Sequence, residues 1–144
     1  GSAFQVMRQS DSAMPALSAV VDNSGPGTVV TLTFTGTNAV DFGSLADGRY
    51  TLSVLAPQVN AGNFDGNGDG IYGDTYTLVG DPAIAPRLFR LFGDVDGNGT
   101  ITPNDFLHFR LALGGTSNIF DFDNDGAVAA NDFIQFRLRF GGSI

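Results

Sequence analysis

The chain has 144 residues, of which 42% are hydrophobic, which is enough to form a core and argues against a wholly disordered chain. Its net charge is −8, and Glu and Lys are absent, so all 15 acidic residues are Asp and all seven basic residues are Arg. No basic cluster could neutralise phosphates, and no apolar run approaches the roughly 20 residues that span a bilayer. We therefore expect neither a nucleic-acid partner nor insertion into a membrane.

Residues 3–92 have the pattern of β-strands, after a Gly1-Ser2 start (1–2) that is typical of an expression-vector remnant. Residues 28–35 alternate apolar side chains with Thr, and residues 49–56 form a second strong strand pattern. Shorter strands are predicted at residues 4–7, 75–79 and 87–92. Their spacing, with Gly, Asn and Asp turns between them, predicts an antiparallel β-sandwich.

The predicted strands are fewer than the about seven that usually close a sandwich. The β region is therefore expected to be incomplete, or to pair its open edges with a neighbour through strand exchange or dimerisation. Three stretches of this region, residues 45–52, residues 65–74 and residues 89–94, share a composition and order with a known kind of segment. On these stretches the region resembles the Ig-like segments that precede dockerin-like tails in planctomycete surface proteins.

From Gly93 onward the chain contains an internal repeat. Residues 94–115 recur as residues 121–142, with an offset of 27 residues, and each copy ends in a Gly-Gly pair suited to capping a helix. Ten of the 15 Asp residues fall in three short loops, two of them in this repeat: Asp65, Asp69, Asp74, Asp94, Asp96, Asp105, Asp121, Asp123, Asp125 and Asp132.

Both repeats begin with the spacing of an EF-hand calcium loop, which places oxygen ligands at positions 1, 3, 5, 7, 9 and 12 and Gly at position 6. The first loop supplies Asp94, Asp96, Asn98, Thr100 through its carbonyl, Thr102 and Asp105. The second supplies Asp121, Asp123, Asp125, Ala127 through its carbonyl and Asp132, with a water expected at Ala129. Such crowded carboxylates are costly without a cation. The alternative is a pair of Asx-rich turns without metal.

A third loop lies within the β region. Asp65, Asn67, Asp69 and Ile71 occupy positions 1, 3, 5 and 7 of a calcium loop, with Gly70 at position 6. Asp74 would close this loop two residues early. The alternative is a flexible, Gly-rich connection.

Neither repeat leaves room for a helix before its loop, so each is a loop followed by an exiting helix. This arrangement resembles a dockerin over residues 93–142, and it implies a small helical calcium module at residues 93–144 of an α+β chain. Dockerins pair with cohesins, so the resemblance implies a cohesin-like partner. Partner choice in the family depends partly on two late loop positions, which hold Pro103-Asn104 and Ala130-Asn131 here in place of Ser-Thr.

Each predicted helix carries two apolar stripes. Phe106, Phe109 and Leu113 share one face of the first helix, and Phe133, Phe136 and Phe140 repeat it in the second, suited to a core between the helices. The other stripe and its neighbouring bases are the candidate partner surface: Leu107, Arg110, Leu111, Ile134, Arg137 and Leu138. The lone His108 is expected on the opposite surface.

We do not expect an enzyme, because Cys, Lys and Glu are absent and the chain has one His. Weak calcium modules depend on the high calcium concentration outside cells, so an extracellular or cell-surface location is expected. Two functions remain: an interaction module that docks a cohesin-like protein, or a calcium-stabilised structural tail without a partner. Exposure of the second stripe would favour docking, and its burial would favour the tail.

Overall fold

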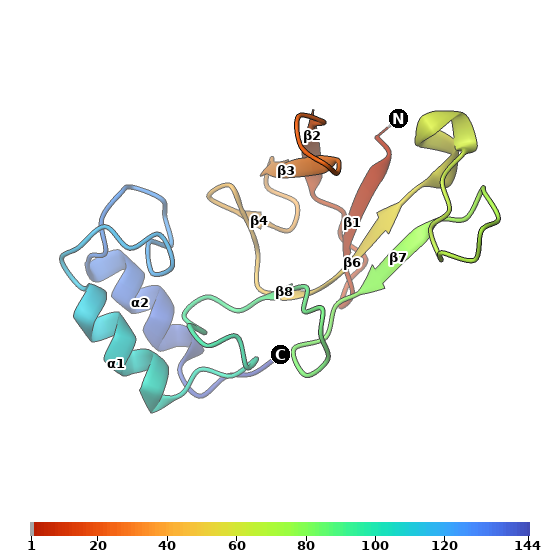
Figure 1. Cartoon of the computed structure of the whole chain (residues 1–144). Coiled ribbons are helices and arrows are strands. Elements are labelled where there is room, and N and C mark those ends of the chain that lie inside the picture. The colour runs from red at the N-terminus through yellow and green to blue at the C-terminus, as the bar shows by residue number, and fades with distance from the viewer. Residues whose placement is uncertain (1) are drawn as a thin grey trace.

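The computed structural model describes residues 2–144, so Gly1 of the predicted vector remnant lies outside the described residues. Strands occupy the chain as far as Arg90, and two helices follow them. Figure 1 shows the two helices together at one end of the molecule and the strands at the other. The architecture is α+β with antiparallel strand pairing, as predicted.

The main sheet is built on β6 (Gly48–Val54), which pairs with β1 (Phe4–Arg8), β7 (Tyr76–Val79) and β8 (Phe89–Arg90). The strands predicted at 4–7, 49–56 and 75–79 are confirmed to within two residues. The strand predicted at 87–92 is shorter than expected. Leu91 and Phe92 leave the sheet because their side chains are buried in the core of the helical region.

A hairpin of β2 (Ala16–Asp22) and β3 (Val29–Thr35) forms a second layer. Leu17, Leu32 and Phe34 of this hairpin pack against the core around Val6, Ala39 and Tyr50. A small hairpin of β4 (Val40–Asp41) and β5 (Ser44–Leu45) follows, and two 3-10 turns, η1 (Ala56–Gln58) and η2 (Asn60–Gly62), come after β6. The described strands lie in three separate sheets, so the Ig-like topology remains a prediction.

The helices α1 (Pro103–Ala112) and α2 (Ala130–Arg139) begin at position 10 of the two predicted loops. Phe109 and Phe136 are each 1% exposed, with ring centroids 4.9 Å apart, and Phe106 packs against them, so the centre of the predicted stripe forms the core between the helices. The prediction is wrong for Leu113, Phe133 and Phe140, which are 54%, 37% and 47% exposed. Gly114 and Gly141 follow the helix ends with φ of 80° and 78°. Glycine adopts this left-handed conformation without a Cβ penalty, as expected of a helix C-cap.

Backbone hydrogen bonds join the two copies of the repeat. Ile101 in the first loop donates to the Gly142 carbonyl and accepts from Gly141 N–H, both at 2.9 Å. Val128 in the second loop makes the same pair of bonds with Gly115 and Gly114, both at 2.8 Å. Each loop is therefore held by the end of the other copy's helix. Between residues 2 and 144, no helix is long and apolar enough to cross a membrane.

Candidate functional site

The carboxylate of the first residue in each candidate loop accepts hydrogen bonds from backbone N–H groups later in the same loop. Asp94 Oδ1 accepts the N–H of Gly97 at 2.9 Å, and its Oδ2 accepts the N–H of Gly99 at 2.7 Å. In the second loop, Asp121 Oδ2 accepts the N–H of Gly126 at 2.9 Å. The glycines at position 6, Gly99 and Gly126, have φ of 82° and 91°. The sharp left-handed turn expected there is thus present in both loops.

The residue that closes each loop is a buried carboxylate at the start of a helix. Asp105 is 0% exposed and accepts the N–H of Val95 at 2.9 Å and that of Thr102 at 2.8 Å. Asp132 is 1% exposed and accepts the N–H of Phe122 at 2.6 Å and that of Ala129 at 2.7 Å. These bonds hold position 12 over positions 2 and 9 of its own loop, and they place a negative charge near the helix N-terminus, where it is favourable.

The carboxylates of each loop converge on one point. Asp94, Asp96 and Asp105 bring one oxygen each to within 4.8 Å of one another, and Asp121, Asp123 and Asp132 do the same. The Oδ1 atom of Asp123 is buried and accepts no hydrogen bond in the structure. Three carboxylates this close repel one another, and an unpartnered buried oxygen is costly. Both features fit a hard cation with oxygen ligands, such as Ca²⁺.

Three predicted ligands have other hydrogen-bond partners in this conformation. The Thr102 hydroxyl donates to Asp105 Oδ2 at 2.7 Å, and Asp125 is outside the converging group, with its Oδ1 accepting the N–H of Ala127 at 2.9 Å. Asn98 Oδ1 accepts the N–H of Thr100 at 2.9 Å. The structure therefore brings positions 1, 3 and 12 together, while position 5 shapes the loop.

Hydrogen bonding and burial shift the acidity of these groups in opposite directions. Burial raises the pKa of Asp94, against the opposing effect of the N–H donors of Gly99 and Asn98. Burial acts in the same direction on Asp105, but the hydrogen bonds from Thr102 and Val95 outweigh it, so that the pKa of Asp105 is lowered. The hydrogen bonds thus favour the ionised form of Asp105, whereas burial disfavours that of Asp94.

The third candidate loop has the same local geometry. Asp65 Oδ2 accepts the N–H of Gly70 at 2.8 Å, and Gly70 has φ of 87°. This bond, with others from the loop backbone, lowers the pKa of Asp65. Asp65, Asp69 and Asp74 bring oxygens to within 4.8 Å, and Asn67 Oδ1 accepts the N–H of Asp69 at 2.9 Å. Ile71, at position 7, donates its N–H to Asp69 Oδ1 at 2.8 Å.

The second apolar stripe of the helices lies at the surface. Leu107 is 55% exposed and Leu111 86% exposed on α1, and Ile134 and Leu138 are 54% and 73% exposed on α2. Arg110 and Arg137 are exposed, as is His108. The acidic residues of the two helices, Asp105 and Asp132, are both buried. The candidate partner surface is therefore apolar, with positive charge and no exposed carboxylate on the helices themselves.

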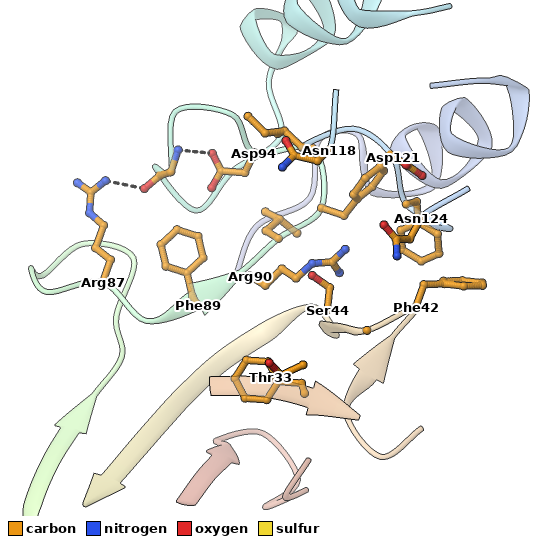
Figure 2. Close-up of a pocket in the computed structure, with 18 residues that line it drawn as sticks. Thr33, Phe42, Ser44, Arg87, Phe89, Arg90, Asp94, Asn118, Asp121 and Asn124 are labelled. Atoms are coloured by element: carbon orange, nitrogen blue, oxygen red, sulfur yellow. Dashed lines mark hydrogen bonds between the residues drawn. The ribbon is translucent and has the colours of Figure 1, made fainter. Parts of the chain in front are cut away.

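Sequence reasoning missed the contact between the two candidate loops and the β region. A cleft of about 840 Å³ lies between them. In Figure 2, Asp94, Asn118 and Asp121 come from the loop side of this cleft, and Thr33 and Ser44 from the strand side. The Arg87 guanidinium, also labelled there, donates to the carbonyl of Gly97 at 2.6 Å. The sequence gives little indication of this Arg87 contact, because a single Arg between a strand and a loop belongs to no periodic pattern.

Comparisons with known proteins give one structural likeness. No family of known proteins matches the chain, and no curated protein matches it either. Among solved structures, the chain is similar to a type II cohesin-dockerin domain from Bacteroides cellolosolvens, with 30% identity and a TM-score of 0.35. The likeness covers 38% of this chain and 90% of that chain.

Proposed function

We propose that the chain is a non-catalytic, calcium-binding, dockerin-like module that attaches a longer extracellular protein to a cohesin-type partner. The observation that carries the proposal is the pair of loops, 27 residues apart, in which three carboxylates converge and position 12 is buried. One loop also holds a buried carboxylate oxygen, Asp123 Oδ1, without a hydrogen-bond partner. Asx-rich turns without metal account for the first-position hydrogen bonds, but they do not require three carboxylates at one point.

Calcium would supply the positive charge that these oxygens lack. It takes six to eight oxygen ligands at flexible geometry, which suits a mixture of carboxylates, carbonyls and water. The first site would be held by Asp94, Asp96, Asn98, Thr100, Thr102 and Asp105, and the second by Asp121, Asp123, Asp125, Ala127 and Asp132. A third ion would be held by Asp65, Asn67, Asp69, Ile71 and Asp74.

The exposed helix stripe favours the interaction module over the structural tail. Leu111 and Leu138 are 86% and 73% exposed, whereas they would be expected to be buried if the helices only stabilised the β region. Surface patches of this kind are typical of interfaces. Because Arg110 and Arg137 flank the stripe and no exposed acid lies on the helices, the complementary partner surface would be apolar with carboxylates at its rim. The structural tail remains the alternative.

Calorimetric titration of chelator-stripped protein with Ca²⁺ tests the metal sites. We expect two sites, or three if the loop at residues 65–74 also binds, together with a rise in melting temperature because the ion binds only the folded loops. Asp123→Ala should abolish one site and leave the others, whereas Asp81→Ala, an acid outside the three loops, should leave all of them. No heat of binding at millimolar Ca²⁺ would refute the proposal.

Binding to immobilised cohesin domains of different types tests the partner surface. We expect calcium-dependent binding to one type, and its loss when Leu111 and Leu138 are both replaced by Asp. Val20→Asp, at a side chain 66% exposed on β2 and away from the helices, is the matched control. Retention of the wild-type affinity by the double Asp variant would show that the partner uses another face. Absence of binding to every cohesin, with calcium binding intact, would favour the structural tail.

The β region offers the remaining part of the proposal. The proposed domain limits are 3–92 for the β region and 93–144 for the helical module. Completion of the β region by strand exchange or by a second copy is an expectation that size-exclusion chromatography with light scattering can test. A concentration-dependent dimer that disappears when an edge residue such as Val79 is replaced by Lys would support edge pairing.

A further inference from the structure

We infer that calcium in the second loop also stabilises the β region, through a network centred on Asp47. This inference rests on the proposed calcium binding and adds to it a defined route between two parts of the chain. The network joins the turn before β6, the residues that precede the first loop, the second loop and the end of α2.

Asp47 connects the strands to the helices directly. Its Oδ1 accepts the backbone N–H of Phe92 at 2.8 Å and an N–H of Arg90 at 3.3 Å, and its Oδ2 accepts the Nε–H of Arg139. The side chains of Asp47, Arg90 and Arg139 are 23%, 18% and 20% exposed. Hydrogen bonds between charged groups are among the stronger ones in proteins, and partial burial limits their screening by salt.

The side chain of Phe122 connects the network around Asp47 to the second loop. Its ring packs edge-to-face on Phe92, with centroids 5.0 Å apart, and on Phe42, 5.6 Å away. The guanidinium of Arg139 lies 4.9 Å from the centroid of the same ring. Phe122 stands between two converging carboxylates, and its own N–H donates to Asp132. A cation that fixes these carboxylates therefore also fixes the ring that touches the β region.

The two copies of the repeat differ at the residues of this contact. The residues equivalent to Phe122 and Arg139 in the first copy are Val95 and Ala112, which offer neither the ring nor the guanidinium. The outward stripe, in contrast, is repeated with little change, since Leu111 recurs as Leu138. The second copy thus has distinct residues on its inward side, where the structure places the β region. The first loop contacts the β region by another route, through the bond from Arg87.

Hydrogen exchange of the full chain, followed by mass spectrometry with Ca²⁺ and with chelator, measures this linkage. Calcium should slow exchange in the helices and also in β6, the latter by roughly 5- to 150-fold, the usual range of coupling between sites. Phe122→Val and Arg139→Ala introduce the residues of the first copy and should remove most of the gain in β6. Asp47→Asn should act in the same way. Asp41→Asn, an acid 3.9 Å from Arg90 that makes no hydrogen bond in the network, should leave the gain unchanged.

The outcomes separate this inference from the proposed function. If calcium protects the helices but leaves exchange in β6 unchanged, the inference is wrong and calcium binding stands. If Phe122→Val and Arg139→Ala bind calcium normally and keep the full gain in β6, the route through Asp47 is wrong. If calcium changes exchange nowhere in the wild-type chain, both proposals fail.

Discussion

The hydroxyl of Thr102 offers a direct test of how the loops are held without a bound cation. It donates to the buried Asp105 carboxylate at 2.7 Å, and the equivalent position in the second copy is Ala129, which has no hydroxyl. The two positions share an extended backbone, with φ and ψ of −116° and 173° at Thr102 and −129° and −162° at Ala129. A Thr at position 129 can therefore present its hydroxyl to Asp132 in the same way.

Thr102→Ala should lower the free energy of unfolding of the calcium-free protein by about 1–2 kcal/mol. A hydrogen bond to a charged group contributes about 1.5–3 kcal/mol, and loss of a Thr at a helix N-cap costs about 0.5–2 kcal/mol. These ranges describe the same bond and are not added. Ala129→Thr should raise the free energy of unfolding by up to about 1 kcal/mol, since the ordering of a new side chain offsets part of the gain.

Urea unfolding in chelator, followed by circular dichroism at the helix band, measures both changes. If the free energy of unfolding falls with urea concentration at the same slope in all variants, the surface area exposed on unfolding is unchanged. Thr102→Ser, which keeps the hydroxyl, is the control for the lost methyl group. If Thr102→Ala were neutral, or Ala129→Thr destabilising, this account of the hydroxyl–carboxylate bond would be refuted.

Three further predictions concern the two cores and the acid limit of stability. Phe136→Ala, at a side chain 1% exposed, should cost about 3–5 kcal/mol in urea unfolding, whereas Leu138→Ala, on the exposed stripe, should change it little. Tyr50→Phe removes the hydroxyl that donates to the Ala46 carbonyl at 2.6 Å and should cost about 1–2 kcal/mol by the same measurement. Because the pKa of Asp105 is lowered in the folded chain, its contribution to stability is fully present above the unfolded pKa of about 3.9 and is lost as the pH falls through the lower folded pKa. The stability gap between wild type and Asp105→Asn, measured in chelator, should therefore close on acidification.

The geometry within the loops could be predicted because it depends on local chemistry. A carboxylate at position 1 reaches N–H groups three to five residues ahead, and Gly at position 6 allows the left-handed turn, so spacing alone indicates the shape. The burial of Phe109 and Phe136 followed from the 3.6-residue period of the helices, whereas the exposure of Leu113, Phe133 and Phe140 at the same period did not. The strand β2 was missed because six of its seven residues are exposed, and its apolar residues form no alternating pattern.

The sequence gives no comparable indication of the long-range ion pairs. Asp47 and Arg139 are 92 residues apart, and each occupies an ordinary position, one in a turn and the other in the last turn of a helix. Phe122 is the best hint in retrospect, because a large ring at loop position 2 replaces the Val95 of the first copy. Comparing the repeats for their differences, rather than for their shared ligands, would have pointed to this surface.

The backbone pairing of the repeats bears on why both copies are present. Neither loop is held by its own helix end, because Ile101 pairs with Gly141 and Gly142, while Val128 pairs with Gly114 and Gly115. One copy alone would leave its loop without these bonds and its Phe109 or Phe136 ring without the facing ring that buries it. The loops that gather the carboxylates and the helices that expose the outer stripe therefore depend on the same paired fold. Cations that stabilise the loops would, for this reason, also stabilise the surface that the proposed partner binds.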